Sequence, residues 1–306
     1  MNIRSVTLGI NWKNQNQLDL SEYINKFMKV SRDRYNKKGY KIRTCRLSMS
    51  PINEYSKFSQ ASSRSIIDWI SNLCDQVGIR WFCVPFTLID ADNPKKLIDT
   101  ASEIISRNSN AFINMIVARN GIISDLAVKE SSRLIRNISK ISNNGFDNFR
   151  VGISCNIEPH TPYFPFAYHA GSDGFSLALE IVDELLEIAE KNVGNGLDSV
   201  RVCMLEYLIK NLRDIDTIGK NIESETGIKF LGLDASLAPF PNGDTSVAKL
   251  VEVLGVEDFG SNGSLFITSY LTDIIKTSLA KSGVRYVGFN GVMYSLLEDD
   301  YLALRN

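Results

Sequence analysis

The chain has 306 residues, 44% of them hydrophobic and 23% charged, which is ordinary for a folded globular protein and excludes an intrinsically disordered one. Its 34 basic residues nearly balance 35 acidic residues, so no global field exists to attract nucleic acid or an acidic membrane surface. No apolar run approaches the roughly 20 residues that a membrane span needs, and we expect neither nucleic acid nor a membrane as a partner.

The N-terminal segment and the cysteines both point to the cytoplasm. The segment MNIRSVTLGINWKNQ has no apolar signal-peptide core and leads directly into a predicted strand. The cysteines are odd in number, widely separated and mostly embedded in apolar stretches such as WFCVPF, without CxxC spacing: Cys45, Cys74, Cys83, Cys155 and Cys203. We interpret them as reduced thiols in a cytoplasmic protein without structural zinc.

Short β-branched runs alternate with longer stretches of helical period along the chain. The predicted strands span residues 5–10, 42–49, 79–86, 111–118, 149–156, 229–233 and 284–289. This alternation is typical of βα units around a mostly parallel sheet. Seven strands fit one sheet or one barrel with the helices outside.

The predicted helices carry start and stop signals. The helix over residues 126–141 follows Ser124 and ends at the Asn143–Gly145 turn, and the helix over 247–254 follows Ser246 and ends at Gly255. Two successive helices, over about 175–193 and 199–223, interrupt the alternation. We therefore predict a single α/β domain over 1–306, with a helical pair at about 173–224 as an added lobe.

The most distinctive polar segment follows the fifth predicted strand and runs from Cys155 to Gly171. It contains both histidines of the protein, His160 and His169, together with three prolines that stiffen it. Stiffness positions side chains for binding or acid/base chemistry, so we expect this loop to line the principal pocket, with Asn156 and His169 facing it. The alternative is a rigid plug whose aromatic residues complete the core and whose histidines satisfy backbone carbonyls.

Polar side chains also end other predicted strands, and the carboxyl ends of parallel strands are where α/β proteins place their sites. The candidates are Arg46, Ser48, Asn114, Arg119, Asp234 and Ser236. The planar fork of arginine suits a carboxylate or a phosphate, which makes Arg46 and Arg119 candidate ligand-binding residues. The alternative for Arg46 is an ion pair with Asp234 inside the barrel.

A Gly-rich stretch, Gly260–Ser264, precedes a predicted helix. Free N–H groups at such a start are able to hold an anion, so Gly263 is a candidate ligand-binding residue. The alternative is a plain turn in which Ser264 caps the helix. The stretch matches neither a P-loop nor GxGxxG, and no nucleotide is inferred.

Several segments, in the same order, resemble those of DUF711 proteins: RSVTLGI, RLSMSPI, FAYHAG, LDASLAPFPNGDTSVAKLVEVLG, DFGSNGSL and GFNGVMYSLLEDD. The resemblance spans nearly the entire chain, to a family without a settled activity. It implies an α/β barrel of two sheet halves, similar to the barrel of pyruvate formate-lyase and other glycyl radical enzymes. Its family-like positions are Arg46, Asn156, His169, Asp234, Ser236, Glu298 and Asp299.

The resemblance carries two further expectations. Many relatives run past the LLEDD segment, so a ten-stranded barrel is expected to be incomplete here, with a partner chain supplying the rest and a homodimer as the commonest assembly. Glycyl radical chemistry at Gly288, within Arg285–Phe289, is a remote alternative, because the motif match is faint and fold alone does not carry function.

Two function classes follow. The first is a binding protein or non-radical enzyme for a small anionic metabolite at the barrel mouth, in which His169 or His160 exchanges protons with Asp234 or Glu298. A variant uses a divalent metal ion as cofactor, held by His160, His169, Glu158 and Asp234. The second is a noncatalytic ligand sensor or oligomeric scaffold on the same fold.

Overall fold

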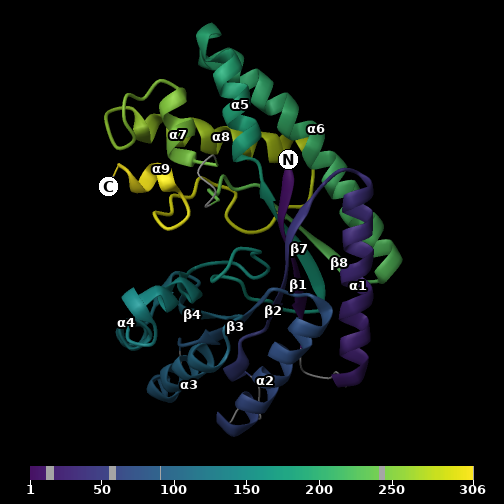
Figure 1. Ribbon diagram of the computed structural model, residues 1–306, viewed down its shortest axis with the longest axis vertical. Helices are drawn as coiled ribbons and strands as arrows, with labels where there is room; N and C mark the ends of the chain where they lie inside the picture. The colour runs from purple at the N-terminus through teal and green to yellow at the C-terminus, as the bar shows by residue number, and fades with distance from the viewer. Residues whose placement is uncertain (12–16, 55–59, 90, 241–244, 306) are drawn as a thin grey trace.

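The computed structural model describes residues 1–11, 17–54, 60–89, 91–240 and 245–305, with only the backbone at 17–19 and 60–63 (Figure 1). In chain order its first half contains β1 (Asn2–Ile10), α1 (Gln17–Lys37), β2 (Ile42–Met49), α2 (Gln60–Val77), β3 (Trp81–Thr87), α3 (Pro94–Arg107), β4 (Ala111–Arg119), β5 (Ile122–Ile123), α4 (Asp125–Ile138) and β6 (Val151–Cys155).

The second half contains β7 (Gly174–Glu180), α5 (Val182–Asn192), α6 (Leu197–Thr226), β8 (Lys229–Asp234), α7 (Val247–Val253), α8 (Ser264–Ser282) and α9 (Asp300–Ala303), with short 3-10 helices at Ile52–Glu54, Asn143–Arg150 and Val193–Asn195. The predicted helix starts at Ser124 and Ser246 are confirmed, since each side chain accepts a hydrogen bond from an amide three residues on.

The strands form one mixed sheet in the order β5-β4-β3-β2-β1-β7-β8, with β6 also pairing with β4. Strands β1, β2, β3, β4 and β6 are mutually parallel, whereas β7 is antiparallel to β1 and parallel to β8. The α/β class is therefore confirmed. In the described ranges no ladder joins β6 to β8, so the sheet is open, and residues 284–289 form an isolated bridge between Tyr286 and Leu233 in place of the predicted strand.

The prediction of one helix over residues 175–193 is wrong. Its first part is strand β7, which lies between β1 and β8, and a helix begins only at Val182. Apolar residues at 175, 177 and 179 alternate with smaller or polar ones, which is the period of a strand, while the 3–4 spacing of Ala178, Val182 and Leu185 imitates a helix. The segment is a strand because it pairs with β1 on one edge and with β8 on the other. The predicted helical pair is therefore one strand followed by two helices.

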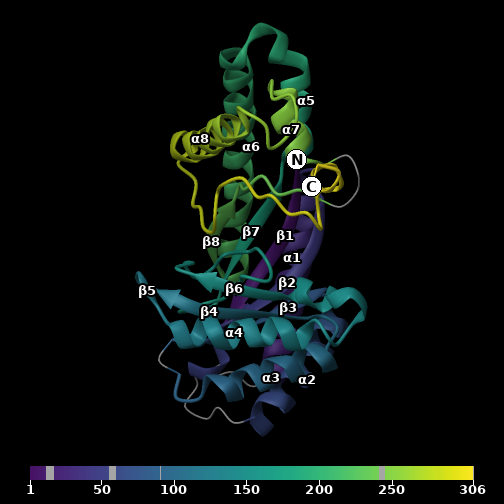
Figure 2. The same cartoon turned by 90° about the vertical axis from the view of Figure 1, so that its left-hand side faces the viewer.

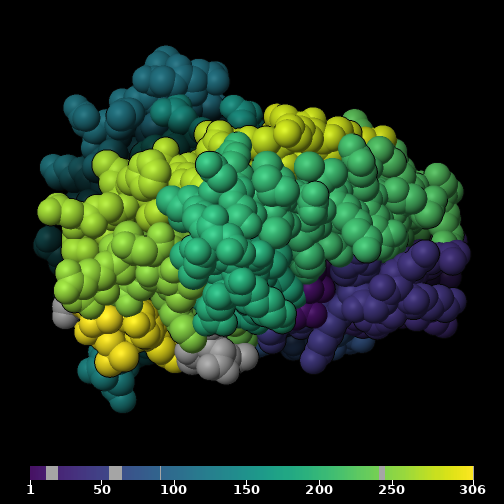
Figure 3. All heavy atoms as spheres, turned by 90° about the horizontal axis from the view of Figure 1, so that it is seen from above, coloured from purple at the N-terminus to yellow at the C-terminus, as the bar shows by residue number. Residues whose placement is uncertain are grey.

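The two faces of the sheet differ in chemistry. On one face apolar residues such as Val6, Leu8 and Leu47 join a large buried cluster that reaches from Ile3 to Val284. Figure 2 shows α2, α3 and α4 on the same side of β2, β3 and β4. Figure 3 shows α5 and α6 together over the end of the molecule seen from above.

The arrangement as a single α/β domain over residues 1–306 with an added lobe stays a prediction.

The other face, which we call the polar face, is covered by the loop of residues 157–172. Four polar-face strand residues donate hydrogen bonds to carbonyl oxygens of the loop: Thr7 and Arg46 to Pro162, Cys83 to Pro165, and Asn114 to Phe166. In Figure 1 this teal loop lies between the half of the molecule that carries β2–β4 and the half that carries α7–α9. Within the described residues, no helix is both long and apolar enough for a membrane span.

Candidate functional site

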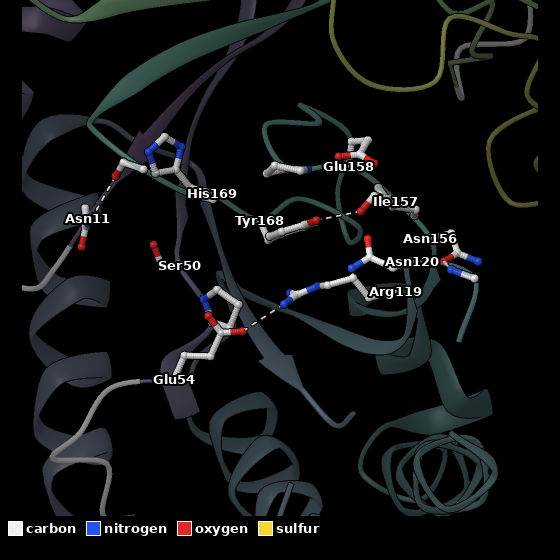
Figure 4. Close-up of a pocket in the computed structure, with 15 residues that line it drawn as sticks. Asn11, Ser50, Glu54, Arg119, Asn120, Asn156, Ile157, Glu158, Tyr168 and His169 are labelled. Carbon is white, nitrogen blue, oxygen red and sulfur yellow. Dashed lines mark hydrogen bonds and ion pairs between the residues drawn. The ribbon is translucent and has the colours of Figure 1, made fainter. Parts of the chain in front are cut away.

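A polar pocket of about 510 Å³ lies at the carboxyl ends of the parallel strands (Figure 4). Asn11 follows β1, Ser50 follows β2, Arg119 ends β4 and Asn156 follows β6, and all four line the pocket together with the 157–172 loop. This is the edge at which open α/β sheets bind ligands, because the strand-to-helix loops diverge there and leave a crevice. The predicted role of the loop as a pocket wall is consistent with this lining.

The backbone beside the pocket is held in a left-handed conformation. Asn120 and Asn156 have φ of 55° and 53°, and the Asn156 side-chain oxygen accepts a hydrogen bond of 2.9 Å from the Gly121 amide. Asparagine is one of the few residues that tolerate this region. The bond ties the end of β4 to the end of β6, so it fixes the turn that carries Arg119.

Arg119 faces Glu54 across the pocket in Figure 4. Its Nη1 lies 3.4 Å from Oε1 of Glu54, and the two side chains are 39% and 43% exposed. The same Glu54 oxygen accepts a shorter bond, 2.7 Å, from the Thr87 hydroxyl. In the described part of the chain Arg119 makes no other polar contact, so most of its guanidinium donors remain open to a ligand.

Tyr168 forms the buried wall behind these charges. Its hydroxyl donates a 2.7 Å hydrogen bond to the Ile157 carbonyl oxygen. Burial raises the pKa of Tyr168 to about 12, with a lowering effect of Arg119 and smaller raising effects of Glu158 and Glu54. The hydroxyl is therefore a neutral donor, and the pocket combines one cation, two carboxylates and several amides.

His169 lines the pocket but its ring is sealed. The residue is 1% exposed, Nε2 lies 3.0 Å from the Ser172 carbonyl oxygen, and Nδ1 lies 3.2 Å from Nδ1 of His160. The ring rests on Gly9 of β1, where a Cβ would come within 2.0 Å of Nδ1. In Figure 4 it points away from Arg119 and Glu54.

The hydrogen-bond partners assign the tautomers of the two rings. A carbonyl oxygen only accepts, so Nε2 of His169 carries the proton and its Nδ1 accepts from Nδ1–H of His160. Burial and then His160 lower the pKa of His169 to about 4, and burial and then Lys229 lower the pKa of His160. Both rings are neutral at pH 7.

This arrangement does not fit the predicted roles of the histidines. Within the described residues no hydrogen bond joins either ring to Asp234 or Glu298. The described residues contain no group of three or more His, Cys, Asp or Glu side chains able to hold a metal ion. Both His169 nitrogens already have partners, so a site built from His160, His169, Glu158 and Asp234 is not formed.

Asp234 is fully buried and does not line the pocket, so it is not placed to act as an acid or a base there. One carboxylate oxygen accepts from the Ser236 amide, the Ser236 hydroxyl and the Asn290 amide, and the other accepts from the Phe289 amide. A Cβ at Gly288 would lie 2.1 Å from this carboxylate, which gives that glycine a packing reason. Asp234 and Ser236 together fasten residues 288–291 to the end of β8.

Arg46 lies on the polar face, and the residues that line the pocket do not include it. Its contacts are hydrogen bonds to Thr44 and Pro162 and two aromatic rings, so the alternative of an ion pair with Asp234 is wrong. Glu298 pairs instead with Arg4, at 2.8 Å. The structure thus separates Arg46 from Arg119, which the sequence had assigned to one ligand.

The remaining predicted residues hold the fold. Asn114 is buried and bonds to Phe166 of the loop and to Ser154, and Asp299 caps α9 and accepts from the first amides of α7. Gly263 is the left-handed residue before α8, and the Ser264 hydroxyl closes the turn by accepting from Gly260. Ser48 is buried on the polar face with no partner for its hydroxyl.

A family model described as "Uncharacterised ACR (DUF711)" matches residues 1–306. The chain belongs to the DUF711 family. Similar relatives are UPF0210 proteins of Sulfurisphaera tokodaii, 26% identical over all of this chain and 72% of the relative, and of Pyrobaculum aerophilum, 23% identical over 99% of this chain and 71% of the relative. A UPF0210 protein of Actinobacillus pleuropneumoniae is 23% identical over 97% of this chain and 70% of the relative.

The names of these relatives state no activity, so the chemistry of this DUF711 chain follows from its own residues. Sequence reasoning missed Glu54, Tyr168 and Asn120 at the pocket and Arg4 on the polar face. A signal existed for three of them: Glu54 and Asn120 follow strand ends, and Arg4 interrupts an apolar strand. Tyr168 looked like one aromatic residue among several in its loop.

Proposed function

We propose that this protein binds a small polar metabolite with a carboxylate or phosphate group in the pocket at the carboxyl ends of β1, β2, β4 and β6. The observation that carries the proposal is the half-exposed guanidinium of Arg119, whose one contact is a long 3.4 Å approach to Glu54. A planar fork with open donors suits a bidentate anion. Glu54 and Glu158 are placed to accept from hydroxyl or amino groups of the same ligand.

Binding is favoured over proton transfer by the state of the histidines. A general base has to present a free lone pair to the ligand, and both nitrogens of His169 are already engaged. The pocket therefore offers recognition groups, and its wall is a neutral phenol and a neutral imidazole.

A thermal-shift screen of carboxylate and phosphate metabolites tests the proposal, since a ligand of the folded state raises the unfolding midpoint by mass action. For a hit, Arg119→Gln should weaken binding by about 10- to 100-fold, as loss of a charge-assisted pair costs about 1.5–3 kcal/mol. Arg136→Gln, the same change on an exposed residue of α4, should not alter binding. Equal affinity of the Arg119 and Arg136 variants would refute the proposal.

We also propose that the open sheet is part of a barrel similar to that of glycyl radical enzymes, and that the protein is a cytoplasmic homodimer. Two observations support the barrel: the parallel group β1–β4 with β6 and the parallel pair β7 and β8 run in opposite directions, and one face of the sheet carries polar residues. The dimer is the commonest closed assembly. A monomer by light scattering at micromolar concentration contradicts the dimer.

A further inference from the structure

A buried arginine on the polar face has no acidic partner. Arg46 is 6% exposed, and its Nε donates to the Thr44 hydroxyl at 3.1 Å while Nη1 reaches the Pro162 carbonyl at the long distance of 3.5 Å. In the described part of the chain Nη2 has no hydrogen-bond partner. Burying a cation costs several kcal/mol unless a counter-charge compensates it, so an unpaired Arg46 is unexpected in a purely structural role.

The charged groups around Arg46 do not neutralise its positive charge. The charged groups that act on it are Arg4, Arg80 and Glu298, and Glu298 is already paired with Arg4 at 2.8 Å. Burial, followed by Arg4, lowers the pKa of Arg46 to about 9, which still leaves it protonated at pH 7. The interior next to β2 thus carries an uncompensated positive charge that an anion would neutralise.

Two hydroxyls, one on the same strand as Arg46 and one in the loop that contacts it, also have open hydrogen-bonding capacity. The hydroxyl oxygens of Ser48 and Thr161 are buried and have no partner. Ser48 is two residues beyond Arg46 on the same face of β2, and Thr161 precedes the proline whose carbonyl contacts Arg46. Buried hydroxyls are normally satisfied, so both hydroxyls have open hydrogen-bonding capacity for a bound group on this face.

Aromatic rings define what else the bound molecule contacts. The Arg46 guanidinium lies 5.1 Å from the ring centre of Trp81 and 5.1 Å from that of Phe164, and both rings are half-buried. Phe149 and Phe164 pack with Phe112 next to Trp81, so apolar ring surface continues away from the charge. A bare inorganic ion would leave this surface unused.

We propose that the polar face holds a second binding site, in which Arg46, with Ser48 and Thr161, binds the anionic group of an aromatic carboxylate or phosphate whose ring packs against Trp81 and Phe164. The site is separate from the pocket of Arg119 and does not depend on the function proposed there. The same guanidinium fork recognises either anion, so the two ligand types are arms of one test.

Tryptophan fluorescence gives a direct readout. The chain has three tryptophans, Trp12, Trp69 and Trp81, so the variant Trp12→Phe/Trp69→Phe leaves Trp81 as the only emitter. Titration with benzoate and with phenyl phosphate should give a saturable change with at least one of them, and benzyl alcohol and inorganic phosphate should bind at least 10-fold more weakly. Absence of saturation with both aromatic anions overturns the proposal, as does equal binding of inorganic phosphate.

Paired variants on one strand separate a ligand role from a structural one. Arg46→Met should abolish the fluorescence response and leave the unfolding midpoint unchanged or raised, because no carboxylate loses its partner. Arg43→Met should lower the midpoint by several degrees, because Arg43 pairs with Glu180, whose side chain is 2% exposed. An Arg46→Met midpoint that falls as far as that of Arg43→Met overturns the proposal.

Two more variants keep the result interpretable. Arg46→Lys retains the charge but not the planar fork, and it should bind about 10-fold more weakly than the parent. Arg119→Gln should bind the aromatic anion as the parent does. A loss of the Trp81 response in Arg119→Gln would place the anion in the other pocket and overturn the second site.

Discussion

At the scale of single residues, the histidine pair shows how close packing decides chemistry. His169 is the residue type that titrates near neutrality, but its ring is held between β1, His160 and a carbonyl oxygen. The space for the ring exists because residue 9 is glycine. Sequence position suggested an acid/base group, whereas the contacts make a neutral hydrogen-bonded pair.

The stability of the protein should depend on the protonation of His169. Its folded-state pKa, lowered by burial and by His160 to about 4, lies below the ordinary histidine value of 6.5. The neutral form is therefore favoured on folding, so this contribution is complete above about pH 6.5 and is lost as the pH falls toward 4, for a total of about 3 kcal/mol. We expect urea unfolding at pH 7 and pH 4.5 to show a smaller decrease in His169→Gln than in the parent.

The two histidines also allow a direct check. NMR of the imidazole C–H groups has only these two residues to resolve. His169 should stay neutral at pH 6, and an ordinary titration of His169 near 6.5 would contradict the sealed geometry. The hydrogen bond to the Ser172 carbonyl oxygen and the charge of Asp173 both raise the pKa of His169, but they do not cancel the lowering by burial and by His160.

Gly9→Ala should destabilise the protein by overpacking. The new methyl group would come within 2.0 Å of Nδ1 of His169, a clash that costs about 1–3 kcal/mol after relaxation. Gly194→Ala is the control, because a Cβ there meets no atom within 4 Å. In the double variant Gly9→Ala/His169→Ala the loss should be smaller than the sum of the single losses. Additive losses in chemical unfolding would show that the ring is not what Gly9 accommodates.

At the scale of elements, the carboxylate of Asp234 fastens the segment after α8 to the end of β8. It accepts hydrogen bonds from residues 236, 289 and 290, and main-chain bonds join Leu233 to Arg285 and Val287. These contacts explain why residues 284–289 run beside β8 with only an isolated bridge. The segment is held by one side chain and a few amides instead of a full ladder.

Asp234→Asn should therefore loosen one segment and cost about 2–4 kcal/mol. Asparagine keeps one acceptor oxygen but replaces the other by an NH2 group, which only donates and faces backbone N–H donors, and bonds to a charged acceptor are worth about 1.5–3 kcal/mol each. Amide exchange should accelerate most at residues 286–293. Asp273→Asn, whose side chain is 60% exposed in a surface ion pair with Arg201, should change stability by less than about 1 kcal/mol. Unchanged exchange at 286–293 would contradict the role of Asp234.

At the scale of the whole molecule, thiol reactivity reports how the buried cluster opens. Cys155 is exposed, whereas Cys45, Cys74 and Cys83 are buried, and burial raises the pKa of each buried thiol. We expect Cys155 to react first in the native protein and the three buried thiols only when the fold opens. Mass spectrometry after timed alkylation measures this order.

The count of thiols provides the control for that experiment. Denatured protein without reductant should take up five labels, because all five cysteines are free. Fewer labels would reveal a disulfide and contradict the expectation of a reducing compartment. Rapid native reaction of Cys83 would instead show that the polar face is open to solvent beneath the 157–172 loop.

The sequence by itself determined the features that depend on near neighbours. The strand at 42–49, the helix starts at Ser124 and Ser246 and the position of the 157–172 loop follow from periodicity, capping and proline, which act over a few residues. The strand-end rule also proposed Arg119 and Asn156; both line the pocket, and their role in ligand binding stays a prediction.

Only the tertiary structure decided the features that depend on distant partners. Segment 174–180 is a strand because β1 and β8 flank it, and Asp234 is fully bonded because residues more than 50 positions later return to it. Arg46 lies within β2 and Arg119 ends β4, but the Arg46 side chain is buried in the interior whereas Arg119 lines the pocket. Local sequence patterns predict which side chains a strand carries. The connections between strands decide which of these side chains come together, and those connections are a property of the whole fold.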